Sequence, residues 1–180
     1  HVPLTQVTEK MRQLGKTLNF GVVYGMGAAA FAKTSGLSRA EAEIFIQEYF
    51  ADFAKVKEWQ ERTKISLREK GYVENANGRR RWLLEIFSEN PRSIAAAERA
   101  GINMPIQSLS ADILKLAMIG IQQELRLRLV LTIHDELLFE IENDKLEETG
   151  ERIRQIMESV YQLAVPIKVN WKAGNNWGEL

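Results

Sequence analysis

The sequence predicts an α+β fold, with a mostly helical part over residues 1–91 and a part over residues 92–180 that contains a small antiparallel sheet. Ser38 and Glu41 have the spacing of a capping box, which is a helix start signal. The tripeptide at 134–136 separates two strongly apolar runs, which is typical of a hairpin. At 180 residues the chain fits one domain or two tightly joined lobes.

Caps, breakers and apolar periodicity assign the remaining elements. We expect a capping residue at Asp52, a helix end at Gly71, and both an end and a new start at Pro105. The turn Asn77-Gly78 predicts a second, smaller hairpin. The expected helices are one that begins within residues 1–10 and enters 11–27, followed by 28–34, 38–50, 54–70, 93–103, 105–126 and 147–162. The expected strands are 72–74 and 79–82, then 127–133 and 137–141, and finally 167–172.

Composition excludes several classes of protein. The chain has no cysteine, which excludes a disulfide framework, a thiolate metal site and a cysteine nucleophile. Two histidines are too few for a phosphohydrolase of the His-Asp type. No run approaches about 18 apolar residues and no signal peptide is evident, so we expect no membrane span. Because the chain opens on His1 rather than methionine, we expect a piece of a longer protein or a processed product.

The formal net charge is zero, but charge is unevenly distributed along the chain. Residues 1–92 carry 15 Lys and Arg against 11 Asp and Glu, whereas residues 93–180 carry 9 against 13. A basic part and an acidic part suit a protein that grips phosphate groups on one side and metal cations on the other. A difference of this size is also common by chance, so the charge split carries little weight alone.

Arg12, Lys16, Phe20 and Tyr24 recur every four residues within residues 11–27. Each step of four advances a helix by about 400°, so the side chains form one stripe with cations at one end and rings at the other. Arginine offers a fork for phosphate oxygens, lysine a point charge, and the rings offer faces for a sugar or a base. The stripe therefore outlines a nucleoside triphosphate. The alternatives are a solvated face for the cations and core positions for the rings.

Four glycines lie in or beside the same segment, at Gly15, Gly21, Gly25 and Gly27. Each glycine inside a helix costs roughly 1 kcal/mol relative to alanine. Helix glycines in such number indicate close approach by a ligand or another backbone, or a segment that moves. A frayed helix end is the alternative, and it fits Gly25 and Gly27 better than Gly21.

His134, Asp135 and Glu136 lie at the tip of the larger expected hairpin. Two adjacent carboxylates held by a sheet offer hard oxygen ligands for Mg²⁺. Neighbouring strand residues point to opposite faces, so the pair shares one ion only if the turn bends it, and Asp135 is the better candidate for a direct ligand. Ordinary acidic turn residues are the common alternative. His134 does not indicate a zinc site, because the other histidine is the terminal His1.

Two further groups indicate contact with nucleic acid. Arg99, Asn103 and Gln107 are spaced four apart, and their side chains can donate to the minor-groove acceptors present on every base pair. The alternative is that Asn103 caps a helix and Arg99 forms a salt bridge. The tripeptide Arg79-Arg80-Arg81 on the smaller hairpin indicates contact with a phosphate backbone, with a solvated surface as the alternative.

Four motifs, in this order, resemble signatures of family A DNA polymerases, the bacterial DNA polymerase I type. The fingers-helix motif of the family is similar to Arg12-x-x-x-Lys16-x-x-x-Phe20-Gly21-x-x-Tyr24-Gly25, and its basic hairpin is similar to Gly78-Arg79-Arg80-Arg81. The next signature of the family is similar to Glu98-Arg99 through Asn103-Met104-Pro105-Ile106-Gln107. Its palm carboxylate motif is similar to Ile133-His134-Asp135-Glu136. The resemblance covers essentially all 180 residues. It implies that residues 1–91 are part of the fingers subdomain and residues 92–180 part of the palm.

The resemblance implies template-directed DNA synthesis, in which a primer 3′-hydroxyl attacks the α-phosphate of a dNTP with the help of two Mg²⁺ ions, or Mn²⁺. The implied nucleotide-binding residues are Arg12, Lys16, Phe20 and Tyr24. The implied DNA contacts are Tyr24, Arg79, Arg80, Arg81, Arg99, Asn103, Gln107 and His134. The implied catalytic residues are Lys16, Asp135 and Glu136, the last two also as metal ligands. The implied partners are primer-template DNA, dNTP and a missing N-terminal part of the polymerase, with no membrane and a cytoplasmic, nucleoid-associated location.

Two departures from the family pattern bear on activity. Thr132 stands where the family usually has glutamine, and its shorter side chain reaches less far toward a primer. Nothing in the chain resembles the family's upstream metal-binding motif of the type Asp-Tyr-Ser-x-Ile-Glu-Leu-Arg, and the thumb and exonuclease domains are absent too. We therefore expect this piece alone to be inactive. The alternative function is a non-catalytic nucleic-acid or nucleotide-binding module that retains the polymerase fold.

Overall fold

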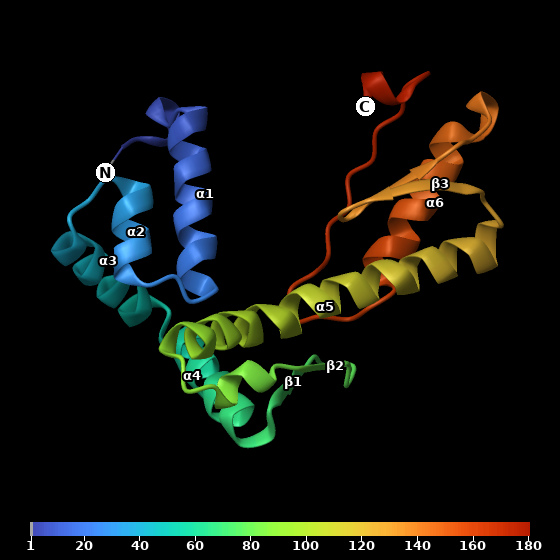
Figure 1. The fold of residues 1–180 in the computed structure, drawn as a ribbon. Coiled ribbons are helices and arrows are strands. Elements are labelled where there is room, and N and C mark those ends of the chain that lie inside the picture. The colour runs from blue at the N-terminus through green and yellow to red at the C-terminus, as the bar shows by residue number, and fades with distance from the viewer. Residues whose placement is uncertain (1) are drawn as a thin grey trace. The chain divides into compact units, whose positions relative to one another are not determined.

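A computed structural model describes residues 2–180 and confirms the α+β class, with helices and two small antiparallel strand pairs (Figure 1). The helices are α1 (Glu9–Val23), α2 (Ala28–Ser35), α3 (Arg39–Asp52), α4 (Ala54–Lys70), α5 (Pro91–Leu125) and α6 (Leu146–Ser159). The strands are β1 (Tyr72–Glu74), β2 (Arg80–Trp82), β3 (Leu129–Ile133) and β4 (Glu136–Phe139). Short 3₁₀ turns cover Leu4–Gln6, Leu84–Phe87, Asn143–Lys145 and Trp177–Glu179.

The chain forms two compact units, His1–Ile106 and Gln107–Leu180, and the boundary between them falls inside α5. This boundary lies later in the sequence than the expected division at residues 91 and 92. Compactness does not identify subdomains, so the assignment of 1–91 to fingers and 92–180 to palm stays a prediction.

Three helix boundaries have well-defined caps. Those at Ser38–Glu41 and Gly71 confirm predictions made at these residues, and the one at Thr8 lies within residues 1–10, where the first helix is expected to begin. The Thr8 hydroxyl accepts the backbone N–H of Met11 at 3.2 Å and starts α1. Ser38 and Glu41 form the expected capping box, in which each side chain accepts a hydrogen bond from the other residue's backbone N–H, at 3.3 and 2.8 Å. Gly71 ends α4 with a φ of 73°, a left-handed conformation that favours glycine.

The expected break at Pro105 is wrong, because α5 continues through it as one helix. A proline removes the N–H that would bond to residue 101, which destabilises a helix but does not always end it. Here close packing offsets that loss. Ile102 and Met104 are buried, and a Cβ on Gly101 would lie only 2.8 Å from a methyl carbon of Leu67 in α4.

Two other expected features are absent from the described residues. Asp52 does not cap α4; it is the last residue of α3, and Phe53 occupies the capping position without a side-chain hydrogen bond. Residues 167–172 form no strand. They are held instead by α6, because the Val169 N–H donates to the Glu158 carboxylate at 3.0 Å and Trp171 lies against Gly150.

Two clusters of buried side chains form the core of the first unit. One joins α1, α2 and α3, and α2 contacts both of its neighbours (Figure 1). The other joins α4, the smaller hairpin and the first half of α5. The buried members of the first cluster are Val22, Phe31 and Ala42, and those of the second are Leu67, Val73, Leu83, Ile86, Ala97 and Met104.

A buried amide connects α1 to α4 in the first unit. Gln60 of α4 is 2% exposed, and its Nε2 donates to the backbone carbonyls of Val22 at 3.1 Å and Val23 at 2.7 Å. The last carbonyls of a helix have no partner within the helix. The Gln60 amide is a donor to the Val23 carbonyl and a second donor to the Val22 carbonyl, which also accepts the Gly25 N–H at 3.0 Å. The C-terminal end of α1 is thereby fixed to α4.

The second unit packs α6 and the larger hairpin around Ile121, Ile153 and Ile156. Leu137 and Phe139 of β4 add to this cluster. Strands β3 and β4 pair antiparallel, with Thr132 opposite Leu137 and an irregularity between residues 129 and 131. The sheet therefore positions its turn, at residues 134–135, on a packed support.

Among the residues that the structure describes, one helix, α5, is long and apolar enough to cross a membrane by length and composition. The lack of long uninterrupted apolar runs in the sequence predicts no membrane span, and the helix passes the test because it is apolar on average. Length and composition alone are a weak indication, because the core helices of globular proteins meet the same criterion. Ala97 and Ile102 are buried in the first unit and Ala117 and Ile121 in the second, so α5 contributes to both cores.

Replacing Gln60 with leucine is expected to lower the free energy of unfolding by about 1–3 kcal/mol, because the Val23 carbonyl loses the Gln60 donor and the Val22 carbonyl keeps only the Gly25 N–H. Urea unfolding of the protein measures the change. Gln47→Leu, at an exposed position of α3, is the matched control and should change stability by less than about 0.5 kcal/mol. Equal stability of the two variants would contradict this role for Gln60.

The Val169 N–H lowers the pKa of Glu158 from its ordinary value of 4.5, and the charges of Arg154 and Lys168 act in the same direction. A lowered pKa means that the anchoring of residues 167–172 is present above pH 4.5 and is lost as the pH falls through the folded-state value. The Val169 amide resonance, followed by NMR, should therefore titrate with a midpoint below 4.5. Glu158→Gln should abolish that titration; a midpoint at or above the ordinary value would refute the anchor.

Candidate functional site

The stripe of α1 has the geometry expected from its four-residue spacing. Arg12, Lys16 and Phe20 are exposed on α1, and Tyr24 is the half-buried residue that caps its C-terminal end. The Phe20 and Tyr24 rings are nearly parallel, with an interplanar angle of 9° and centroids 6.4 Å apart. Phe20 is 56% exposed, although large apolar side chains are usually buried. The stripe therefore presents two cations and an aromatic face to the surroundings.

The glycines within residues 11–27 differ in what surrounds them. Gly25 has a φ of 85°, and a Cβ there would lie 3.6 Å from the Arg99 Cγ, so the end of the stripe and Arg99 of α5 are brought close together. A Cβ on Gly21 would meet the side chain of Met26. Around Gly15 there is open space, so no neighbour within the chain requires a glycine. Gly25 thus belongs to a defined left-handed turn and not to a frayed end.

Arg99, Asn103 and Gln107 all lie on α5, whose continuity through Pro105 keeps their helical spacing regular. Asn103 is inside the helix, so it is not a cap. The ion pair next to Arg99 is made by its neighbour Glu98, with Arg68 of α4. Arg99 is exposed and Asn103 half-buried in the first unit, and Gln107, the first residue of the second unit, is exposed.

The three arginines of the smaller hairpin are not equivalent. Arg80 pairs with Glu74 at 3.0 Å, and its guanidinium lies 4.7 Å from the centre of the Tyr72 ring. Arg79 precedes β2, and its backbone is tied to the buried Asn75. Arg81 lies in β2 and is exposed. Arg80 therefore already has a carboxylate partner.

The turn between β3 and β4 consists of His134 and Asp135, and Glu136 is the first residue of β4. All three side chains are exposed. His134 has a φ of 53°, which is left-handed and costs energy for a residue with a Cβ. Among the described residues no three His, Cys, Asp or Glu side chains gather as a metal site. Asp135 and Glu136 thus offer carboxylate oxygens but not a complete ligand set.

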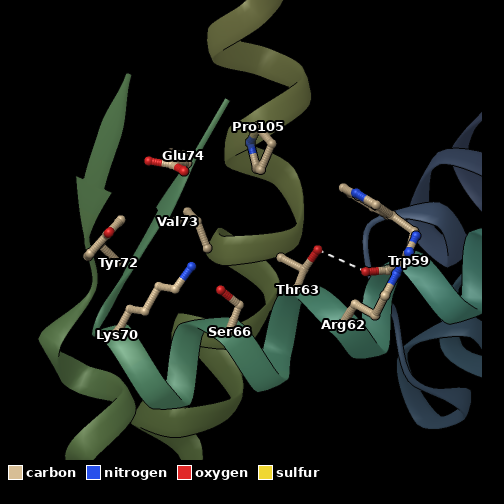
Figure 2. Close-up of a pocket in the computed structure, with 9 residues that line it drawn as sticks. All are labelled: Trp59, Arg62, Thr63, Ser66, Lys70, Tyr72, Val73, Glu74 and Pro105. Atoms are coloured by element: carbon tan, nitrogen blue, oxygen red, sulfur yellow. Dashed lines mark hydrogen bonds between the residues drawn. The ribbon is translucent and has the colours of Figure 1, made fainter. Parts of the chain in front are cut away.

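The predicted residues fall into both units. The stripe, the smaller hairpin, Arg99 and Asn103 belong to the first unit, and Gln107 and the carboxylate turn to the second. Sequence reasoning missed a polar face of α4 that lines a pocket, formed by Trp59, Arg62, Thr63, Ser66 and Lys70 (Figure 2). The residues of this polar face have helical spacing in the sequence, but they form no recognisable motif.

Comparison with known proteins gives a consistent result. The family model described as DNA polymerase family A matches residues 1–179. A thermostable DNA polymerase I from Thermus filiformis is 42% identical over 176 residues, which cover 96% of this chain and 21% of the relative. DNA polymerase I from Pseudomonas aeruginosa is 41% identical over 183 residues, covering 99% of this chain and 20% of the relative. The chain thus spans about a fifth of the length of these relatives.

A solved structure is also similar. The POL domain of Pol1 from M. smegmatis, in complex with DNA primer-template and dNTP, matches with a TM-score of 0.85 and 37% sequence identity. The match covers 93% of this chain and 30% of that one.

Replacing His134 tests the backbone strain of the turn. His134→Gly is expected to be more stable than His134→Ala by about 1 kcal/mol, because only glycine adopts a φ of this sign without steric cost. Thermal unfolding of the two variants gives the difference. An alanine variant as stable as the glycine variant would show that the turn is unstrained.

Proposed function

Because this chain belongs to DNA polymerase family A, we propose that it supplies part of a polymerase active site for template-directed DNA synthesis. The observation that carries the proposal is the exposed stripe of α1, in which two cations precede two parallel rings. That arrangement matches the order of groups in a nucleoside triphosphate. The solved relative was determined with primer-template and dNTP, which supports these two partners for the present chain.

The stripe binds the incoming nucleotide in this proposal. Arg12 offers two parallel N–H donors to phosphate oxygens, and Lys16 adds a compact charge that neutralises the leaving pyrophosphate and donates a proton to it. Phe20 packs on the sugar and base. Tyr24, at the fixed end of α1, lies by the templating base.

The remaining predicted residues hold the DNA. Arg99, Asn103 and Gln107 follow the minor groove, where amide and guanidinium donors read acceptors common to all base pairs. His134 lies by the primer terminus. Among the three arginines, the exposed Arg81 is favoured as a backbone phosphate contact, because Arg80 has Glu74 as its partner.

Asp135 and Glu136 suit a divalent cation by their chemistry, because both are exposed and offer the oxygen ligands that Mg²⁺ prefers. Asp135 is the direct ligand in this proposal, with Glu136 beside it, and Mn²⁺ can replace Mg²⁺. Two such ions, when bound, stabilise charge on the attacking and leaving oxygens of an in-line phosphoryl transfer. The other ligands come from outside residues 1–180, so the chain alone is expected to be inactive.

The setting of the proposed reaction is the intact polymerase, whose N-terminal part supplies the missing carboxylate. DNA synthesis of this type places the protein in the cytoplasm, on the nucleoid. The competing function is a nucleic-acid or nucleotide-binding module without catalysis that retains the polymerase fold.

Asp135→Asn in the intact polymerase separates these two functions. The rate of single-nucleotide addition to a primer is expected to fall by about a thousandfold, because a metal ligand contributes several kcal/mol at the transition state. Binding of primer-template should be retained. Asp144→Asn, at an exposed position of a 3₁₀ turn in the same unit, is the control and should leave the rate unchanged. An unaffected rate in Asp135→Asn would favour the non-catalytic module.

A further inference from the structure

Three large apolar side chains are exposed at the base of the smaller hairpin, in the first unit. Trp82, Leu84 and Phe87 are 60%, 62% and 60% exposed. Single exposed apolar residues are common on protein surfaces, whereas a group of them in one place is typical of a binding surface. Leu84 and Phe87 both lie against Gly71, because a Cβ there would be 3.4 and 2.9 Å from their side chains. Trp82 pairs with Tyr72, the next residue along β1, so all three exposed side chains gather around one strand end.

The hairpin turns one face toward the core and the other away from it. Val73 is buried in the core cluster, so its neighbours on β1 alternate to the outer face. Tyr72 and Trp82 are cross-strand partners on that outer face, with ring centroids 4.9 Å apart and an interplanar angle of 57°. The Arg80 guanidinium lies 4.7 Å from the centre of the Tyr72 ring. The outer face therefore carries three flat groups side by side.

Trp82 is the member of this face that can accept a further ring. Tyr72 is half-buried and contacts both Trp82 and Arg80, so its own ring is already covered. The Trp82 indole is supported by Tyr72 and remains mostly exposed. A supported, exposed ring is a surface on which a nucleic-acid base can stack, and it tolerates any sequence because every base has a flat π face.

The charge of the hairpin selects the kind of partner. Residues 70–84 contain four cations, Lys70, Arg79, Arg80 and Arg81, and one carboxylate, Glu74. Glu74 is paired with Arg80, whereas the exposed Arg81 forms no ion pair within the described residues. A positive field attracts a phosphate backbone and gives no advantage to an apolar protein segment. Cations beside an exposed ring are the combination that binds single-stranded nucleic acid.

We propose that Trp82 is a stacking platform for an unpaired base of a single-stranded nucleic acid, whose backbone is attracted by the basic hairpin. Bases inside a duplex already stack on their neighbours, so the platform takes an unpaired one. In the proposed polymerase this partner is the unpaired part of the template strand. The inference rests on the proposed function for that partner, but it requires neither the metal ions nor the chemical step.

The first test uses the full chain and two strands that differ only in their bases. The chain is titrated with a single-stranded oligothymidylate and with an abasic oligonucleotide of the same length and charge, and NMR follows the Trp82 indole N–H. The signal is expected to shift with the oligothymidylate and much less with the abasic strand, because stacking requires a base. Equal shifts with both strands, or no shift with either, would overturn the proposal; the second result would favour a protein partner for this face.

Substitutions separate stacking from charge. Trp82→Ala is expected to weaken binding of the oligothymidylate about tenfold, and Trp82→Phe to restore most of the affinity, because phenylalanine keeps a ring. Trp177→Ala removes an indole of equal exposure, 61%, from a 3₁₀ turn of the second unit, and this control should leave the affinity unchanged. Arg81→Gln should reduce the salt dependence of binding. Equal losses in Trp82→Ala and Trp177→Ala would count against the platform.

The intact polymerase shows whether the platform acts on a template. Trp82→Ala there should weaken binding of a primer-template with an unpaired template extension about tenfold, and should leave binding of a blunt-ended duplex unchanged. Both affinities are measured without dNTP or Mg²⁺, so a failure of the catalytic proposal, which Asp135→Asn tests, would not alter them. Equal weakening for the two DNAs, or none for either, would contradict the role of Trp82.

Discussion

The buried amide of Gln60 is the contact on which the geometry of the first unit depends. Its two hydrogen bonds satisfy carbonyls of Val22 and Val23, at the point where α1 ends and Tyr24 begins the turn. The left-handed Gly25 follows at once and lies against Arg99 of α5. One side chain of α4 therefore fixes the aromatic end of the stripe relative to α5.

The other end of the stripe has no comparable restraint. Arg12 and Lys16 are exposed, and the Cβ position of Gly15 between them faces open space. The contacts of α1 come from its C-terminal half, where Leu18 and Val22 pack in the core and Asn19 accepts a hydrogen bond from the Tyr49 hydroxyl at 2.6 Å. That asymmetry suits a nucleotide-binding element that closes over its substrate.

Local signals in the sequence predicted most of the fold. Thr8, the Ser38–Glu41 box and Gly71 act through neighbours a few residues away, so their effect can be read from the sequence alone. The failed cap at Asp52 is local, because α3 continues through that residue, but the other two failures depend on distant contacts. Pro105 stays helical because α5 packs closely on α4, and residues 167–172 are held by α6 instead of a strand partner.

The candidate site, like the fold, has residues that could be predicted from the sequence and residues that could not. Motif residues such as Arg12 and Asp135 were visible in sequence because their spacing carries a known chemistry. Gln60 and the pocket face of α4 were not, because a lone glutamine and scattered polar residues acquire meaning only when another element packs against them. The pairing of Arg80 with Glu74 likewise changes the interpretation of a basic tripeptide, and only the strand register reveals it.

The central claim is that the stripe of α1 holds the triphosphate of an incoming nucleotide while Asp135 holds its metal. A structure of the intact polymerase with primer-template, a non-reactive dNTP analogue and Mg²⁺ tests this most directly. Phosphate oxygens are expected on Arg12 and Lys16, the base against Phe20, and Asp135 in the coordination shell of an ion on the same triphosphate. A triphosphate bound away from Arg12 and Lys16, or an ion without Asp135, would contradict it.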